Sequence, residues 1–124
     1  MAYPEVEARI RGIRTDRTHG ASWLSRAAVE TLRLQAERSK ASSACELLEE
    51  LKEVGRELVQ ARPSMAPLAN GVCQVVQDIL RSGEEDVASL RLFTARRAGE
   101  WIEESEGALA KAAEHASHLI SRGA

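Results

Sequence analysis

The apolar residues of this chain recur every three or four positions over almost its whole length, and this spacing constrains the fold more than any other feature. Such a period places apolar side chains on one face of an α-helix. No stretch of useful length alternates between apolar and polar residues as a half-buried strand does. Five helical segments result, at about 4–15, 20–40, 44–61, 64–82 and 84–120. We therefore expect an all-α protein: an antiparallel bundle of about five helices with short connections and a long last helix.

Several residues fit the ends of these segments. Ser43 is followed three positions later by Glu46, which is the form of a capping box at a helix N-terminus. Gly83 follows the fourth segment and suits the left-handed conformation that ends many helices. The fourth segment also carries a broad apolar stripe, so we expect it to be the central helix. Gly99 and Gly107 weaken the last pattern and leave open whether it forms one helix, a bent helix or two.

Composition places the chain among globular proteins of one domain. Of its 124 residues, 44% are hydrophobic and only 3% are aromatic, so we expect an aliphatic core. The net charge of −2 gives no reason to expect direct nucleic-acid binding. The N-terminus has no basic region followed by an apolar core, and no apolar run approaches the roughly 20 residues of a membrane span. We expect a soluble cytoplasmic protein.

The cysteines and histidines give no sign of a metal centre. Cys45 and Cys73 lie in helical patterns without metal-type spacing, and we interpret them as reduced, half-buried packing residues. A disulfide is the less favoured alternative. His115 and His118 are three positions apart on one predicted helix, but no third ligand accompanies them in the sequence. We therefore expect no metal and no cofactor.

One junction between predicted helices combines an arginine, a rigid proline and a capping residue. Its sequence is Ala61-Arg62-Pro63-Ser64-Met65-Ala66-Pro67-Leu68. Ser64 is a good N-cap, which would put Pro67 at the third helical position. Free N–H groups and the helix dipole favour an anion at a helix N-terminus, and a guanidinium recognises phosphate or carboxylate. Arg62 and Ser64 are therefore candidate phosphate ligands. The alternative is that Arg62 is an exposed cation at a helix C-terminus.

A second junction has similar character. Its sequence is Arg17-Thr18-His19-Gly20-Ala21-Ser22. Gly20 lets a ligand approach the backbone closely, and Thr18 or Ser22 is placed to cap the helix that follows. We interpret Arg17, Gly20 and Ala21 as further candidate phosphate ligands, the alternative being a turn followed by tight helix packing. We expect the two helix beginnings to open toward a common side and to share one phosphate-bearing ligand.

Arginines are frequent in the first quarter of the chain. We interpret Arg9 and Arg11 as the solvated face of the first helix. Arg14 and Arg17 approach the second junction, so they either steer a phosphorylated ligand or belong to that same solvated face. Trp23 follows the junction and is either a core or boundary aromatic or one wall of a ligand pocket.

The two junctions give the chain a resemblance to a known family. The segment from Ile13 to Ser22 and the Arg62-Pro63-Ser64 junction resemble the N-terminal part of the alpha, beta and delta subunits of translation initiation factor 2B. Relatives of those subunits include archaeal ribose-1,5-bisphosphate isomerase and methylthioribose-1-phosphate isomerase. In the isomerases the comparable patterns read roughly Arg-Gly-Ala and Arg-Pro-Thr and lie near the sugar phosphate. Here His19 stands in place of the first arginine, and Ser64 replaces threonine but keeps a hydroxyl.

The resemblance implies that residues 1–124 form an N-terminal helical domain, truncated before a larger α/β domain. It implies an assembly and regulatory domain of an initiation factor 2B subunit. Such a subunit would form homo- or hetero-oligomers through the absent domain, with the translation initiation machinery and a phosphorylated small molecule as partners. The alternative is the N-terminal domain of a ribose-1,5-bisphosphate isomerase-like enzyme. Its catalytic cysteine and aspartate would lie in the absent domain, so this segment would hold no catalytic residue and be inactive alone. A generic helical protein-interaction module is a further alternative.

Overall fold

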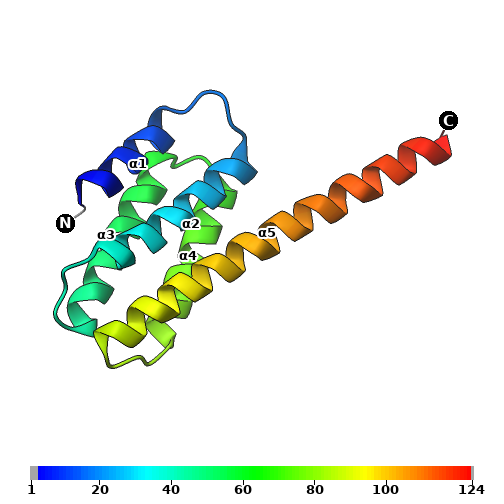
Figure 1. Ribbon diagram of the computed structural model, residues 1–124. Coiled ribbons are helices and arrows are strands. Elements are labelled where there is room, and N and C mark those ends of the chain that lie inside the picture. The colour runs from blue at the N-terminus through cyan, green and yellow to red at the C-terminus, as the bar shows by residue number, and fades with distance from the viewer. Residues whose placement is uncertain (1–2, 124) are drawn as a thin grey trace.

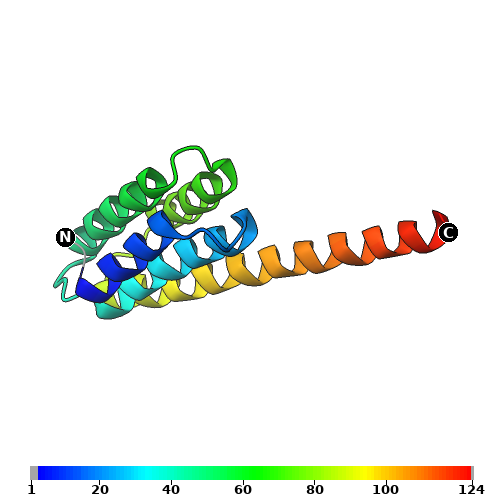
Figure 2. The same cartoon turned by 90° about the horizontal axis from the view of Figure 1, so that it is seen from above.

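The computed structural model describes residues 3–123, and the side chains of residues 3–118, as a bundle of α-helices (Figure 1). The helices are α1 (Pro4–Thr15), α2 (Ala21–Arg38), α3 (Ala44–Ala61), α4 (Ala66–Arg81) and α5 (Val87–Gly123). Consecutive helices run in opposite directions, and α5 extends far beyond the other four (Figures 1 and 2). No strand occurs between residues 3 and 123. The expected all-α bundle with a long last helix is confirmed, and α5 is one continuous helix through Gly99 and Gly107.

The core is aliphatic and is centred on α2. This helix, like α3, contacts all four others, whereas α4 contacts only α2, α3 and α5. The helix α2 also has more buried residues than α3 or α4. The expectation that α4 is central was therefore wrong. The reason is that α2 buries polar residues which weaken its apolar stripe in the sequence. Ser25 and Thr31 donate their hydroxyls to carbonyls four residues earlier, at 2.7 and 2.8 Å, and Gln35 donates to Glu50 Oε1 at 2.8 Å.

The long helix α5 is fixed to α4 by an aromatic ring against a glycine. Trp101 of α5 packs so closely on Gly71 of α4 that an added Cβ at Gly71 would lie 2.5 Å from Cζ2 of the indole. Arg97 of α5 donates from Nε to Asp78 Oδ2 of α4 at 2.8 Å, and this pairing raises the pKa of Arg97. The first half of α5 therefore belongs to the bundle, whereas residues 106–118 are all exposed.

Two predicted helix ends are confirmed. Ser43 Oγ caps α3 by accepting from the backbone N of Glu46 at 3.2 Å. The reciprocal bond differs from a full capping box, because the Glu46 carboxylate accepts from the backbone N of Ser42, at 2.9 Å. Gly83 follows α4 with a φ of 71°, the left-handed conformation that glycine adopts without a steric penalty.

The predicted N-caps of α2 and α4 were wrong. Neither Thr18 nor Ser22 caps α2, whose N-cap is Gly20 and has no side-chain cap. Ser64 does not cap α4 either, because Met65 is its N-cap and Pro67 occupies the second helical position, not the third.

The later start of α4 has a local cause. A turn lies between the helices, and the backbone N of Met65 closes it by donating to the carbonyl of Arg62 at 3.0 Å. Pro63 suits the second position of such a turn, because its ring fixes φ near the required value. Ser64 is therefore the third residue of this turn and not the N-cap of α4.

The cysteines differ from expectation in one respect. Cys45 and Cys73 are free thiols, but both are exposed and not half-buried. Helical spacing alone places a residue only roughly around the helix, so it does not separate a boundary position from an outward one.

No helix among the described residues is long and apolar enough to span a membrane.

Candidate phosphate-binding site

The loop between α1 and α2 is organised by Asp16. Its Oδ1 accepts from the backbone N of Thr18 at 2.9 Å and of His19 at 2.8 Å. Its Oδ2 lies 2.7 Å from His19 Nδ1. These contacts fold residues 16–19 into a compact turn in which one carboxylate substitutes for backbone acceptors. His19 is therefore engaged with Asp16, and it also stacks on Trp23, with ring centroids 3.6 Å apart.

The same contacts make the Asp16 carboxyl unusually acidic. The side-chain hydrogen bond from His19, followed by the backbone N–H of His19 and that of Thr18, lowers the pKa of Asp16 from 3.8 to about 2. We predict that the ionised carboxylate contributes its full stabilisation above about pH 4. That contribution is lost as the pH falls through about 2, because the folded form then takes up the proton. A carboxyl-detected NMR titration measures this, and an Asp16 midpoint near 3.8 would contradict the loop geometry.

Arg62 joins the α3–α4 junction to the end of α1. Its Nε donates to the carbonyl of Ile13 at 2.8 Å, and Nη2 donates to the carbonyl of Asp16. Ile13 lies in the last turn of α1, and Asp16 is the C-cap of that helix, so the guanidinium satisfies carbonyls that have no partner within the helix. Arg62 thus lies at the end of α3, as the alternative interpretation held, but it is half-buried and not exposed, and it also binds the end of α1.

A basic hollow lies at this contact. It is lined by Arg14, Thr15, Asp16, Arg17 and Arg62. Arg14 and Arg17 are exposed, and neither forms an ion pair within the part of the chain that the structure describes. A guanidinium has five N–H donors, so Arg62 retains donors after its two bonds to α1. Three cationic side chains therefore surround one surface depression.

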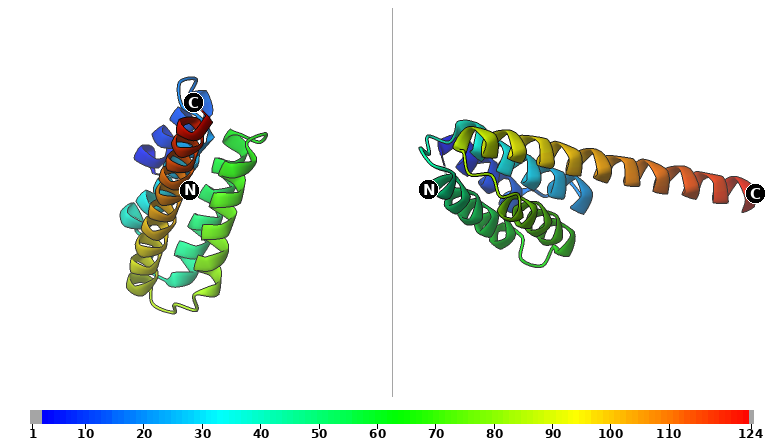
Figure 3. Two further views of the ribbon diagram at one scale, coloured as in Figure 1. Left: turned by 90° about the vertical axis from the view of Figure 1, so that its right-hand side faces the viewer. Right: turned by 90° about the horizontal axis from the view of Figure 1, so that it is seen from below.

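The remaining predicted ligands do not line this hollow. Gly20 and Ala21 lie at the beginning of α2, where Gly20 is exposed and an added Cβ would meet nothing within 4 Å. Ser64 is exposed in the α3–α4 turn. Both loops nevertheless lie at the same end of the bundle (Figures 1 and 3). The structure therefore brings Arg17 and Arg62 together and places Gly20, Ala21 and Ser64 nearby, Gly20 and Ala21 at the beginning of α2 and Ser64 in the α3–α4 turn.

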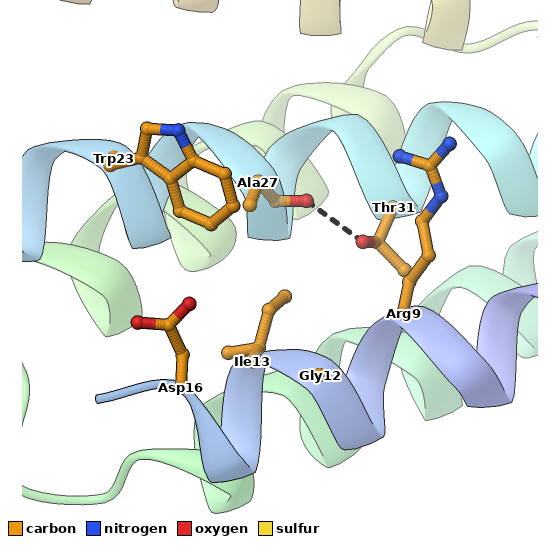
Figure 4. Close-up of a pocket in the computed structure, with 7 residues that line it drawn as sticks. All are labelled: Arg9, Gly12, Ile13, Asp16, Trp23, Ala27 and Thr31. Carbon is orange, nitrogen blue, oxygen red and sulfur yellow. Dashed lines mark hydrogen bonds between the residues drawn. The ribbon is translucent and has the colours of Figure 1, made fainter. Parts of the chain in front are cut away.

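A second hollow lies between α1 and α2 and shares Asp16 with the first (Figure 4). It has a volume of about 270 Å³ and is lined by Arg9, Gly12, Ile13, Asp16, Trp23, Ala27 and Thr31. Trp23 is thus a wall of a pocket, as one of its two interpretations held. Arg9 is exposed, as expected of a solvated face, but it also borders this hollow.

Sequence reasoning did not single out Asp16. The available signal was its spacing, because an aspartate two and three positions before residues with free N–H groups is typical of an Asx-type turn.

The described residues contain no group of three side chains able to hold a metal ion, and His115 and His118 lie on the exposed part of α5.

Comparison with known proteins assigns the chain to a family. The model of the initiation factor 2 subunit family matches residues 17–124. The ribose 1,5-bisphosphate isomerase of Pyrococcus furiosus is 34% identical over 99% of this chain, and that of Thermococcus kodakarensis is 34% identical over 84%. Among solved structures, a chain of the tetrameric eIF2B-beta2-delta2 complex from C. thermophilum matches 82% of this chain with a TM-score of 0.69 and 24% identity, which shows a shared fold.

The chain matches only part of the length of these proteins. It spans 39% and 33% of the two isomerases, and 34% of the eIF2B chain. The family model covers the Arg62-Pro63-Ser64 junction and, from Arg17 onward, part of the segment from Ile13 to Ser22 that carries the resemblance. The sequence relatives and the family model agree with each other and with the helical fold. The chain is therefore a member of the initiation factor 2 subunit family.

Proposed function

We propose that this chain is the N-terminal helical domain of a longer protein, and that its basic hollow binds the phosphate group of a phosphorylated sugar. The observation that carries the proposal is the convergence of Arg17 and Arg62 on one hollow, joined by Arg14. Paired guanidinium groups are suited to phosphate because their N–H groups bind its oxygens in a planar, bidentate manner. The two isomerase relatives, at 34% identity, favour a sugar phosphate as the ligand.

In this proposal the domain binds and positions the phosphate, and it moves no proton. The hydroxyl of Thr15 is donated to the carbonyl of Arg11 at 3.0 Å, and the Asp16 carboxylate is held by its own loop. Neither cysteine lines the hollow. The chemistry of an isomerase would therefore fall to a following domain, and this domain would contribute charge and orientation.

Arg17 is the residue whose substitution best tests this proposal, because Arg62 also holds the end of α1. We expect Arg17→Gln in the longer natural protein to weaken binding of a pentose phosphate about tenfold or more, since a charge-assisted hydrogen bond is lost. Isothermal titration calorimetry measures the dissociation constant. Arg11→Gln is the matched control, because Arg11 is an exposed arginine of α1, the helix that ends just before Arg17, but does not line the hollow. Equal losses in the two variants, or no binding by the unmodified protein, would refute the proposal.

An assembly role in an initiation factor 2B-like complex is the second candidate. The observation that favours it is the exposed half of α5, whose residues 106–118 project beyond the bundle (Figure 2). The shared fold with a chain of the eIF2B complex is compatible with it. We propose that oligomers would form through the following domain. Co-purification of translation initiation factors from the native lysate, without pentose phosphate binding, would favour this candidate over the isomerase-like one.

A further inference from the structure

The hollow between α1 and α2 has an apolar floor. Ile13 is only 4% exposed, Gly12 has no side chain, and Ala27 adds a single methyl group. The Thr31 hydroxyl donates its hydrogen to the carbonyl of Ala27 at 2.8 Å, so that hydrogen is not available to a ligand (Figure 4). A volume of about 270 Å³ lies just below the usual range for drug-sized ligands, about 300–1,000 Å³. The floor and the volume suit one small ring.

The indole of Trp23 forms an aromatic wall of this hollow. It extends over the space between the helices (Figure 4) and is 43% exposed, which is unusual for the largest apolar side chain. His19 stacks on it at an interplanar angle of 11°, and Asp16 in turn holds His19. His19 does not line the hollow, so the indole presents a different part of its surface there. The wall is thus held in place before any ligand arrives.

Opposite charges border the two ends of the hollow. Asp16 lies at the end near Trp23, and Arg9 lies at the other end (Figure 4). Arg9 lies in α1 and Asp16 is its C-cap, seven positions later, which corresponds to a helix rise of about 10 Å. Arg9 has no ion-pair partner among the described side chains, so its N–H groups are available. Asp16 Oδ2 accepts a single bond, from His19, and it keeps a lone pair for another donor.

We infer that the hollow between α1 and α2 binds a small single-ring aromatic molecule that carries a hydrogen-bond donor at one end and an anionic group at the other. The ring lies against Trp23 and the apolar floor, the donor faces Asp16, and the anion faces Arg9. A para-substituted ring with a hydrogen bond of about 2.9 Å at each end is long enough to connect Arg9 with Asp16. This site shares Asp16 with the basic hollow, but Arg9, Trp23 and the apolar floor do not line that hollow, and the inference does not depend on the proposed phosphate binding.

Nuclear magnetic resonance of the 124-residue chain with 4-aminobenzoate as the probe tests the inference. The chain holds two tryptophans, and Trp101 packs on Gly71, away from the hollow. We expect the indole N–H signal of Trp23, identified by its loss in Trp23→Phe, to shift saturably while that of Trp101 stays unchanged. Benzoate and aniline each lack one end group, so each is expected to bind about tenfold more weakly. No saturable shift, equal shifts of both indoles, or equal affinity for benzoate would overturn the inference.

A pair of arginine variants supplies the second arm of the test. Arg9→Gln is expected to weaken 4-aminobenzoate about tenfold or more, because it removes the charged partner of the carboxylate. Arg11→Gln is the matched control on the same helix and is expected to leave the affinity within twofold. Arg9→Gln should also leave pentose phosphate binding by the longer natural protein unchanged, which separates failure here from failure of the phosphate proposal. Equal effects of the two variants on 4-aminobenzoate would overturn the assignment.

Discussion

Replacing Gly71 by alanine is expected to lower the free energy of unfolding by about 1–3 kcal/mol. The new Cβ would lie 2.5 Å from Cζ2 and 2.9 Å from Cη2 of Trp101. Both atoms belong to a rigid ring, so α4 and α5 must move apart or the indole must leave its position. Urea denaturation followed by circular dichroism measures the change.

A glycine substitution elsewhere in the bundle separates this clash from ordinary glycine effects. Gly12 lies in α1, and an added Cβ there would meet nothing within 4 Å. We expect Gly12→Ala to raise the free energy of unfolding by about 0.5–1 kcal/mol, because alanine loses less conformational entropy in a helix. If Gly71→Ala were as stable as Gly12→Ala, Trp101 would not pack on Gly71 as described.

Replacing Arg62 by alanine is expected to lower the free energy of unfolding by about 2–3 kcal/mol. A hydrogen bond from a charged group contributes about 1.5–3 kcal/mol, and two are lost here, although water replaces part of them at this partly exposed site. Arg62→Lys is expected to recover only part of the loss, because an ammonium lacks the fork that spans the Ile13 and Asp16 carbonyls. Thermal and urea unfolding of the three proteins measure these differences.

Arg81 provides the matched control for Arg62. It is exposed in the last turn of α4 and forms no ion pair within the described residues, so it shares only the general effect of a cation at a helix C-terminus. We expect Arg81→Ala to change the free energy of unfolding by no more than about 0.5 kcal/mol. Equal destabilisation by the two substitutions would mean that the hydrogen bonds from Arg62 to the end of α1 add no stability beyond this general effect of a helix C-terminal cation.

The helices could be predicted from the sequence because each has its own local period. The bounds of α1, Pro4–Thr15, match the expectation at both ends, and Ser43 and Gly83 mark the ends of their helices correctly. The position of each helix in the bundle was harder to predict from the sequence. Burial of Ser25, Thr31 and Gln35 in α2 depends on hydrogen bonds that a hydropathy pattern does not contain. The choice of α4 as the central helix failed for this reason.

The candidate site was predictable in its residues more than in its geometry. Local chemistry singled out Arg17 and Arg62, and the fold brings them to one hollow although 44 residues lie between them. Arg62 also binds the carbonyls of Ile13 and Asp16. The sequence around Arg62 does not indicate this contact, because it depends on the tertiary fold. Ser64 was wrongly expected to be the N-cap of α4, because a serine before a helix fits a turn as well as an N-cap. The turn beginning at Arg62 and closed by Met65 decides between the two.

A crystal structure of the proposed longer protein with a bound pentose phosphate would show directly whether the basic hollow is a phosphate site. We expect one phosphate oxygen within about 2.7–3.2 Å of a guanidinium nitrogen of Arg17 and another within the same distance of Arg62. A phosphate bound elsewhere, with both arginines turned away from it, would contradict the account.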